Sequence, residues 1–502
     1  MNRDQRRVVI VGGGITGLSA AFYIRKFCRE KDIPVHITLI ERSPRLGGKI
    51  CTLRKDGHVI ERGPDSILAR KTPIIDLTRD LGLESELVPT NPEAGKTYIV
   101  RRGEFHRMPQ GAVLGIPTRL GPFFRSGLIS PAGKARAVLD LFLPARREEG
   151  DESLGSFVRR RLGSEVLEYM TDPVLAGIYS ADLDRLSLRA TYPQFHEVEH
   201  KYRSLIRGMA KASGRPQAAG SGQTGGTPAG SAQAAGQTAS AARPLPEHLR
   251  HSMFLSYRNG LYTLIEQLEE RSRGIEMITG EEVVRLERAE NGLRLATASG
   301  RTVEADAAVL AVPAFVLGAL LPESPAAQMF ARMPYVSVAN VVFGYDKAAL
   351  KRALDGSGFV IPRKERRFIT ACTWMSSKWG HTAPEGRALL RCYVGRAGEE
   401  GWTLLSDEEI IANVKEEVRR LMGIEAEPDL IELNKHMHAM PQYEVGHLDR
   451  VKALRQELRA SMPEVVAAGS AFEGIGVPDC VRQGKEAAMY VAERLEHAPR
   501  HE

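Results

Sequence analysis

The feature that most constrains this chain is a glycine pattern close to its N-terminus. Residues 12–17 read Gly-Gly-Gly-Ile-Thr-Gly and contain G-x-G-x-x-G, directly after an apolar run and directly before a helical pattern at 15–31. In this setting the first glycine permits a tight turn, the second lets a pyrophosphate approach the backbone, and the third lets the helix pack on the strand. Glu41 ends the next predicted strand, where a carboxylate can accept hydrogen bonds from an adenosine ribose. The pattern predicts a βαβ unit that binds a dinucleotide.

Length and composition place this unit in a large globular chain. The 502 residues correspond to roughly three domains at about 150 residues each. With 43% hydrophobic and 26% charged residues, the composition excludes wholesale disorder, collagen-like repeats and a disulfide-dense secreted scaffold. The five cysteines never form a C-x-x-C pair, which fits a reducing cytosol and predicts no metal site. The apolar run at 307–321 is interrupted by Pro313 and is shorter than the about 18 residues of a membrane helix, so we expect no membrane-spanning segment.

Two further glycine turns extend the dinucleotide signal. Residues 41–49 read ERSPRLGGK, and residues 468–480 read AGSAFEGIGVPDC before a last predicted helix at 483–495. Glycines before a helix present backbone N–H groups and a positive dipole end to a ligand. The first motif alone is compatible with NAD or FAD, but no second G-x-G-x-x-G with an acidic partner is present to hold a nicotinamide cofactor. The paired glycines at 47 and 48 resemble a turn that lines the pyrophosphate and ribityl chain in flavoproteins of the amine-oxidase and protoporphyrinogen-oxidase superfamily, which favours FAD. Because a second nicotinamide site is not expected, electrons are expected to leave the flavin to oxygen or another external acceptor.

The remaining chain divides at a compositional boundary. Residues 211–246 are rich in Gly, Ala, Ser and Gln and contain no acidic residue, which predicts a flexible surface insertion. Before it, a hairpin is expected around residues 55–57, and helical patterns dominate residues 76–207. After it, a helix at 261–271 precedes two strands joined at Asn291-Gly292.

At this point the chain resembles the protoporphyrinogen/coproporphyrinogen oxidase family of the amine-oxidase superfamily. The motifs that carry the resemblance cover nearly the whole chain outside the insertion: Gly63-Pro64-Asp65-Ser66, Ala69-Arg70-Lys71, Gly177-Ile178-Tyr179-Ser180, Ala371-Cys372-Thr373-Trp374, Met440-Pro441-Gln442-Tyr443 and the segment from Glu473 to Cys480. The likeness is greatest to the Gram-positive bacterial type, which oxidises coproporphyrinogen III.

The resemblance implies a fold, a cofactor and a reaction. It implies a mixed α/β fold in which a Rossmann-like FAD-binding domain is interleaved with substrate-binding and helical domains. It also implies a noncovalent FAD and an enzyme of haem biosynthesis that oxidises coproporphyrinogen III to coproporphyrin III and returns the electrons to oxygen as hydrogen peroxide. The expected location is the cytoplasm with loose membrane association, and a transient contact with the downstream metal-inserting enzyme is expected. The alternatives are a protoporphyrinogen IX oxidase, a flavin-bearing porphyrin carrier without turnover and, more distantly, an amine oxidase or carotenoid desaturase.

Site residues follow from the same resemblance. Lys71 matches a substrate-facing basic position near the flavin. Lys71 and its neighbour Arg70 are the predicted catalytic-site residues, and either could anchor a propionate. The residues that match FAD contacts are Gly12, Gly13, Gly14, Ile15, Thr16, Gly17, Glu41, Arg42, Lys49, Gly63, Pro64, Asp65, Ser66, Val283, Ile475, Gly476 and Val477.

The expected domain order is discontinuous. Three segments, 1–80, 247–325 and 446–502, are expected to form the FAD-binding domain. Residues 81–210 are expected to form a substrate-binding and helical, membrane-facing region, and 326–445 a second part of the substrate-binding domain.

A basic, apolar stretch suggests where an acidic substrate binds. Residues 101–136 hold seven Lys and Arg against one Glu, interleaved with apolar runs. This pattern suits an acidic amphipathic ligand, an anionic membrane surface or a solvated basic face. Nucleic acid is not expected as a partner, because no stacking-aromatic or helix-turn-helix pattern accompanies the charge.

Overall fold

The N-terminal βαβ unit forms the middle of a five-stranded parallel sheet in the computed structural model, which describes residues 5–146, 148, 150–214, 244–290 and 292–497. The strand order is β12-β2-β1-β16-β22, and all four pairings are parallel. The strands are β1 (Arg6–Val11), β2 (Val35–Glu41), β12 (Glu276–Thr279), β16 (Ala307–Leu310) and β22 (Val465–Ala467). Segments hundreds of residues apart therefore share one sheet.

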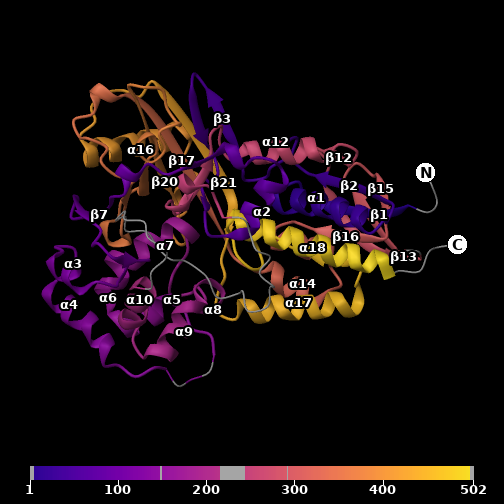
Figure 1. The fold of residues 1–502 in the computed structure, drawn as a ribbon, viewed down its shortest axis with the longest axis horizontal. Coiled ribbons are helices and arrows are strands. Elements are labelled where there is room, and N and C mark those ends of the chain that lie inside the picture. The colour runs from indigo at the N-terminus through magenta and orange to yellow at the C-terminus, as the bar shows by residue number, and fades with distance from the viewer. Residues whose placement is uncertain (1–4, 147, 149, 215–243, 291, 498–502) are drawn as a thin grey trace.

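Both faces of this sheet are covered. Val8 and Ile10 face one core, while Val9 and Val11 face the other, as the alternation of a strand requires. The first core lies under α1 (Ile15–Glu30), α2 (Thr72–Asp80), α12 (Tyr262–Arg271) and α18 (Val477–His497), and α18 runs beside α1 in Figure 1. The second core lies under the antiparallel sheet β13 (Val283–Ala289), β14 (Gly292–Thr297) and β15 (Thr302–Ala305) with α13 (Ala314–Leu320), α14 (Pro325–Ala331) and α17 (His447–Ser461).

A seven-stranded sheet forms the second part of the fold. Its order is β21-β17-β20-β19-β18-β7-β8, and α16 (Asp407–Met422) closes an apolar core against it. The strands are β7 (Thr97–Arg101), β8 (Glu104–Arg107), β17 (Tyr335–Asp346), β18 (Gly358–Val360), β19 (Ile369–Trp374), β20 (Arg387–Val394) and β21 (Leu430–Pro441).

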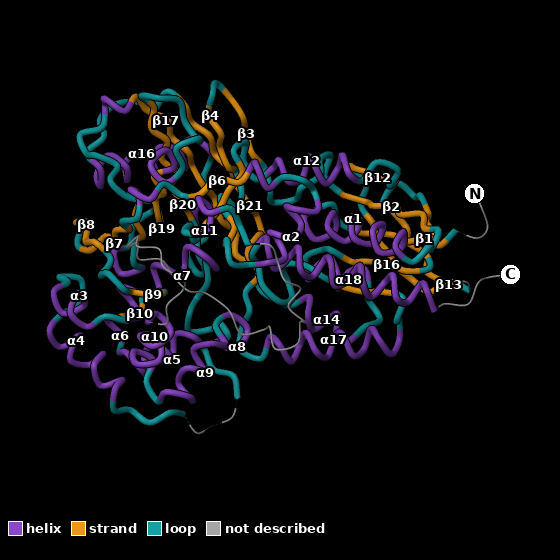
Figure 2. The backbone as a smooth tube through the Cα atoms, in the orientation of Figure 1, coloured by secondary structure: helices purple, strands orange, loops and turns teal. Residues whose placement is uncertain are grey.

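A helical region forms the third part and has its own apolar core. Figure 2 shows helices gathered at the lower left with few strands among them. The helices are α3 (Leu120–Arg125), α4 (Pro131–Val138), α5 (Leu154–Leu162), α6 (Ser164–Val166), α7 (Asp172–Tyr179), α8 (Leu188–Thr191), α9 (Pro193–Tyr202) and α10 (Leu205–Gly214), with a π-helical segment at Leu167–Thr171 between α6 and α7.

Smaller elements connect these parts. They are the hairpin β3 (Thr52–Lys55) and β4 (His58–Glu61), the sheet of β5 (Ile67–Leu68), β11 (Phe254–Tyr257) and β6 (Leu87–Pro89), the pair β9 (Ala112–Val113) and β10 (Ile116–Pro117), and the short helices α11 (Glu247–Arg250) and α15 (Met375–Lys378). Among the described residues, no helix is both long and apolar enough to cross a membrane.

The structure corrects one expectation about secondary structure. Residues 87–117, expected within a helical stretch, contain the strands β6 to β10. The reason is local, because Arg102 and Gly103 both have positive φ (54° and 77°) and make a two-residue turn that joins β7 to β8. Such a turn matches the twist of a hairpin, and the pair extends the edge of the seven-stranded sheet.

Part of the predicted insertion lies outside the described residues. Residues 211–214 end α10 and residues 244–246 precede α11, whereas 215–243 are not described. Of the predicted turn at 291–292, Asn291 also lies outside the described residues.

Candidate functional site

The turn from β1 into α1 requires glycine at two positions, one in the loop and one in the first turn of α1. Gly12 has φ +104°, and a Cβ on it would lie 2.5 Å from the carbonyl oxygen of Ala311 at the end of β16. A Cβ on Gly17 would lie 1.9 Å from the carbonyl oxygen of Gly12. By contrast, Gly14 has extended backbone (φ −73°, ψ 178°), and a Cβ there would meet nothing within 4 Å. Two glycines therefore close the turn, and the third borders open space.

The N-terminus of α1 fits an anion. No side chain caps it, and its first turn contains no acidic residue. The first N–H groups of a helix have no partner within the helix, and they carry the positive end of its dipole. A pyrophosphate above Gly14 would satisfy these donors, so the residues present fit the dinucleotide that the sequence predicts.

The second glycine turn lies directly on this loop. The N–H of Gly47 donates to the carbonyl of Gly13 at 2.8 Å, and a Cβ on Gly48 would lie 3.2 Å from the Cα of Gly14. The next residue, Lys49, keeps accessible surface, although the surrounding protein desolvates its ammonium group and lowers its pKa. Among the described residues, no carboxylate forms an ion pair with Lys49. An accessible ammonium group without a counterion suits an anionic ligand.

Glu41 is largely engaged by the protein itself. Its carboxylate accepts hydrogen bonds from the N–H of Gly13 at 2.6 Å and from the N–H and hydroxyl of Ser43 at 2.8 and 2.6 Å. A carboxylate has about four acceptor positions, so about one remains for a ribose hydroxyl. Glu41 thus also fixes the glycine loop, a role that the sequence did not predict.

Arg42 and Val283 lie at the same end of the sheet. The Arg42 guanidinium is 3.9 Å from the Glu282 carboxylate, and both groups are exposed. The N–H of Gly280 donates to Ser43, and that of Glu281 donates to Glu41. The start of β13 at Val283 therefore lies close to the Glu41 end of β2.

The segment from Gly63 to Ser66 packs against the Lys49 turn and the seven-stranded sheet. A Cβ on Gly63 would lie 1.8 Å from the carbonyl oxygen of Lys49. After Pro64, the Asp65 carboxylate pairs with Lys378 at 3.0 Å and accepts from the Ser66 hydroxyl at 2.7 Å. Burial alone would raise the pKa of Asp65, but Lys378 and Arg391 outweigh it and lower the pKa to about 2. The segment is therefore fixed by the close backbone contact of Gly63 with Lys49 and by the ion pair of Asp65 with Lys378.

The C-terminal loop reaches the same place. Gly484 lets α18 approach α1, since a Cβ on it would lie 2.5 Å from the carbonyl oxygen of Thr16. Val477 is the first residue of α18 and packs on the core beneath α1, whereas Ile475 packs on the core of the helical region. The loop at 474–477, with Gly476 between these two side chains, therefore joins the helical region to the N-terminus of α1.

Lys71 lies beside the start of α18, where its ammonium group already has a carboxylate partner. Its ammonium is 2.6 Å from the Asp479 carboxylate in the first turn of α18, and both side chains are partly exposed. Its neighbour Arg70 is exposed, although nearby protein lowers its pKa by desolvation. The sequence did not predict Asp479 as the partner of Lys71, although it lies inside the quoted C-terminal motif.

Part of the basic stretch has an internal role. Arg101, Lys134 and Arg136 donate hydrogen bonds to backbone carbonyls of the helical region. These three cations stabilise the ends of helices and turns, so they support the solvated or structural interpretation. The other four, Arg102, Arg107, Arg119 and Arg125, are exposed.

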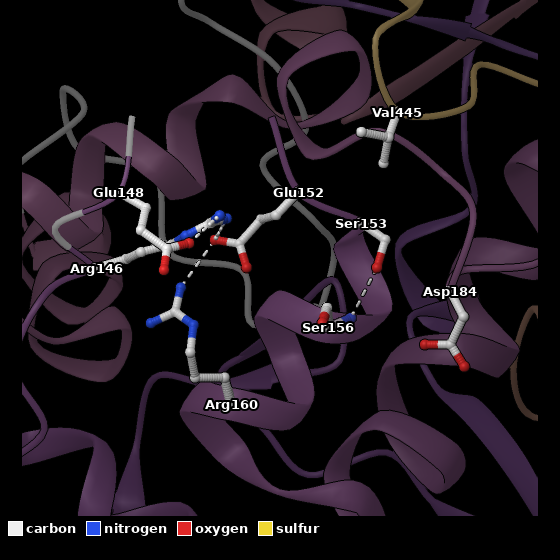
Figure 3. A pocket seen from close by; sticks show the side chains of 8 residues that line it. All are labelled: Arg146, Glu148, Glu152, Ser153, Ser156, Arg160, Asp184 and Val445. Atoms are coloured by element: carbon white, nitrogen blue, oxygen red, sulfur yellow. Dashed lines mark hydrogen bonds and ion pairs between the residues drawn. The ribbon is translucent and has the colours of Figure 1, made fainter. Parts of the chain in front are cut away.

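A recess elsewhere in the helical region is a poor candidate for the site. This recess has a volume of about 630 Å³. Figure 3 shows side chains that line it, among them Arg146, Glu152, Ser153 and Arg160. Its charges are compensated, because Arg146 pairs with Glu148 at 2.8 Å and Arg160 with Glu152 at 2.9 Å. None of the predicted site residues lines it.

Comparisons with known proteins show the family of this chain. Residues 15–492 match the model of the flavin containing amine oxidoreductase family. The chain is 44% identical to the coproporphyrinogen III oxidase of Bacillus subtilis (strain 168), over 97% of this chain and 98% of that one. It is 30% identical to the human protoporphyrinogen oxidase, over 97% and 98% of the two chains. A crystal structure from Exiguobacterium sp. 255-15, provisionally assigned as a protoporphyrinogen oxidase, matches with a TM-score of 0.83 and 35% identity over 97% and 99% of the chains.

These matches confirm the α/β flavoprotein fold and the FAD cofactor expected from the sequence, and they identify an FAD-dependent oxidase. The chain belongs to the flavin-containing amine oxidoreductase family, within its group of coproporphyrinogen III and protoporphyrinogen oxidases.

Proposed function

We propose that this protein oxidises coproporphyrinogen III to coproporphyrin III, with oxygen as the final electron acceptor and hydrogen peroxide as its second product. The observation that carries this proposal is the 44% identity to a coproporphyrinogen III oxidase along almost the entire chain, against 30% to a protoporphyrinogen oxidase. The alternative substrate, protoporphyrinogen IX, has two propionates where coproporphyrinogen has four. A contact with the metal-inserting enzyme that takes the product, and loose membrane association, are further parts of the proposal.

Different segments of the site would hold different parts of the cofactor. The N-terminus of α1, the Gly47-Gly48 turn and Lys49 would hold the pyrophosphate, and Glu41, Arg42 and Val283 the adenosine end. The segments Gly63–Ser66 and 475–477 would enclose the flavin end. Segments 1–80, 247–325 and 446–502 would then form the FAD-binding domain, with the substrate bound by parts of 81–210 and 326–445. When bound, FAD supplies the hydride chemistry, and the protein supplies orientation and electrostatics.

The direct test is turnover. Purified holoenzyme mixed with coproporphyrinogen III in air should produce porphyrin fluorescence and peroxide faster than autoxidation does. Its kcat/KM should exceed that for protoporphyrinogen IX. No increase over the autoxidation control would reject an oxidase of this substrate, and a reversed preference would favour the protoporphyrinogen IX alternative. Anaerobic addition of porphyrinogen should bleach the flavin, whereas a carrier without turnover would leave its spectrum oxidised.

Lys71 is proposed to bind a propionate, which makes its ion pair with Asp479 a competitor. Replacing Lys71 with methionine removes the cation and leaves Asp479 to repel the substrate, so KM should rise by about 10- to 100-fold, as expected for the loss of a charge-assisted hydrogen bond. Replacing Asp479 with asparagine frees the ammonium, so KM should fall. The readout is steady-state kinetics at constant FAD occupancy.

Opposite effects distinguish substrate binding from a purely structural ion pair. A structural pair would be weakened by either change, and KM would then move in the same direction in both variants. A matched control is Lys26→Met on α1, where the ammonium lies 2.9 Å from Asp80 away from the glycine loops. This variant should keep the wild-type KM.

A further inference from the structure

Two stacked aromatic rings bind the loop at 470–474, which precedes α18. Tyr443 follows β21 and His447 begins α17, and their rings are nearly parallel with centroids 4.0 Å apart. Tyr443 is 1% exposed and His447 is fully buried. Tyr443 ends the motif Met440-Pro441-Gln442-Tyr443 and has no role in the cofactor or substrate contacts proposed above.

The two rings bind three alternate residues of the loop. The Tyr443 hydroxyl donates to the carbonyl of Ser470 at 2.7 Å and accepts from the N–H of Gly474 at 3.1 Å. The Nε2 of His447 lies 2.6 Å from the carbonyl of Phe472. A carbonyl can only accept, so His447 carries its proton on Nε2 and donates. The backbone from 470 to 474 is therefore fixed at each second residue.

Burial keeps both rings in the neutral state that these bonds need. Burial raises the pKa of the Tyr443 hydroxyl well above its usual value, so the hydroxyl remains a donor. Burial also lowers the pKa of His447 to about 4, and no described group bonds its Nδ1. Tyr443 and His447 therefore keep their hydrogen bonds to residues 470, 472 and 474 at neutral pH.

Two arginines also hold the loop. Arg455 binds the Glu473 carboxylate with two bonds of 2.9 Å, and Arg482 donates to the Glu473 carbonyl at 3.0 Å. Gly474 then turns with φ +106°, which directs the chain into residues 475–477 and the N-terminus of α18. The orientation of those N–H groups depends on where Gly474 is held.

The backbone of Tyr443 belongs to a different part of the fold. Its carbonyl accepts from the N–H of Ser187 at 2.7 Å, and the adjacent Gln442 side chain donates to the carbonyl of Tyr179 at 3.3 Å. One residue thus connects the helical region, through its carbonyl, with the loop before α18, through its hydroxyl.

We propose that Tyr443, supported by His447, is a positioning residue that sets the loop at 470–477 against the flavin and ties this loop to the helical region. The inference rests on the flavin site of the proposed function. It predicts that the hydroxyl controls how well the N–H groups before α18 meet the cofactor, although Tyr443 does not itself need to touch the cofactor.

The test is Tyr443→Phe, which keeps the stacked ring and removes only the hydroxyl. FAD should bind about tenfold more weakly, or ~1.4 kcal/mol. The Gly474 amide should exchange with solvent faster, and the flavin potential should fall, since misaligned N–H groups stabilise the reduced anionic flavin less. Turnover should show a lower kcat with KM little changed. The matched control is Tyr345→Phe, another buried tyrosine, on β17 in the core under α16, which should keep wild-type FAD affinity.

A second pair of variants keeps the test decisive if Tyr443→Phe does not fold. His447→Phe retains an aromatic ring but loses the donor to Phe472, whereas His447→Gln retains a donor. FAD affinity should fall in the first and be partly restored in the second. Wild-type affinity and Gly474 exchange in Tyr443→Phe, or equal losses in both His447 variants, would overturn the proposal. FAD binding is measured without porphyrinogen, so failure of the proposed reaction would be seen separately in the wild-type assay.

Discussion

Replacing Gly14 with alanine should remove most FAD binding while the apoprotein stays at least as stable as wild type. The Gly14 backbone is extended and suits any residue, and an added Cβ meets no protein atom within 4 Å. The substitution should even stabilise the apoprotein by about 0.4–1 kcal/mol, because alanine restricts the unfolded chain. The methyl group would, however, fill the space where the pyrophosphate is proposed to meet α1. We expect at least about 100-fold weaker FAD binding, or ~3 kcal/mol.

The measurements are FAD titration and thermal unfolding of the apoprotein, with Gly17→Ala as the comparison. A Cβ on Gly17 would lie 1.9 Å from a backbone oxygen, so this variant should lose both FAD binding and apoprotein stability. If Gly14→Ala bound FAD like wild type, the pyrophosphate would have to lie elsewhere than at the N-terminus of α1.

The second large effect is expected in the helical region. Arg161 is fully buried, and its guanidinium pairs with Asp140 at 2.6 Å and with Glu199 at 3.3 Å, both also fully buried. It further donates to the carbonyls of Asp140, Pro144 and Arg203. Replacing Arg161 with methionine leaves buried Asp140 without its cation and these carbonyls without this donor, whereas Glu199 keeps Arg160. Loss of one partner in a buried ion pair costs about 3–5 kcal/mol. We expect the free energy of unfolding, measured with urea, to fall by this amount.

A neighbouring arginine on the same helix provides the control. Arg159 pairs with Asp184 at 2.9 Å, but their side chains are 45% and 54% exposed. An exposed pair contributes about 0–1 kcal/mol, so Arg159→Met should unfold almost like wild type. Similar losses in the two variants would show that the buried network does not hold this region together.

Features that depend on local backbone geometry could be predicted from the sequence. The glycine loop, the turn at 55–57 between β3 and β4 and the helix at 262–271 each follow from residues that are close neighbours along the chain. The turn at Arg102-Gly103 is equally local, but only its positive φ angles distinguish it from the helical pattern around it.

Long-range pairings could not be predicted in this way. Lys71 and Asp479 are separated by 408 positions, and neither sequence segment indicates that the two side chains form an ion pair. Arg161 follows Arg159 and Arg160 in the same helix, and only the folded structure shows that Arg161 is the fully buried one of these three. The role of Tyr443 likewise depends on a loop that the chain reaches 27 residues later.

The strand order of the parallel sheet has a consequence for how the protein is made. β1 leaves the ribosome well before β22 and α18, which complete the sheet and cover α1 and which lie more than about 450 residues further along the chain. At about 5–20 residues per second, this interval lasts tens of seconds. During that time the side of α1 at Thr16, Ser19 and Ala20, where Gly484 of α18 makes its closest approach, lacks its final cover. The flavin end of the proposed site, which includes residues 475–477, is therefore completed only after this interval.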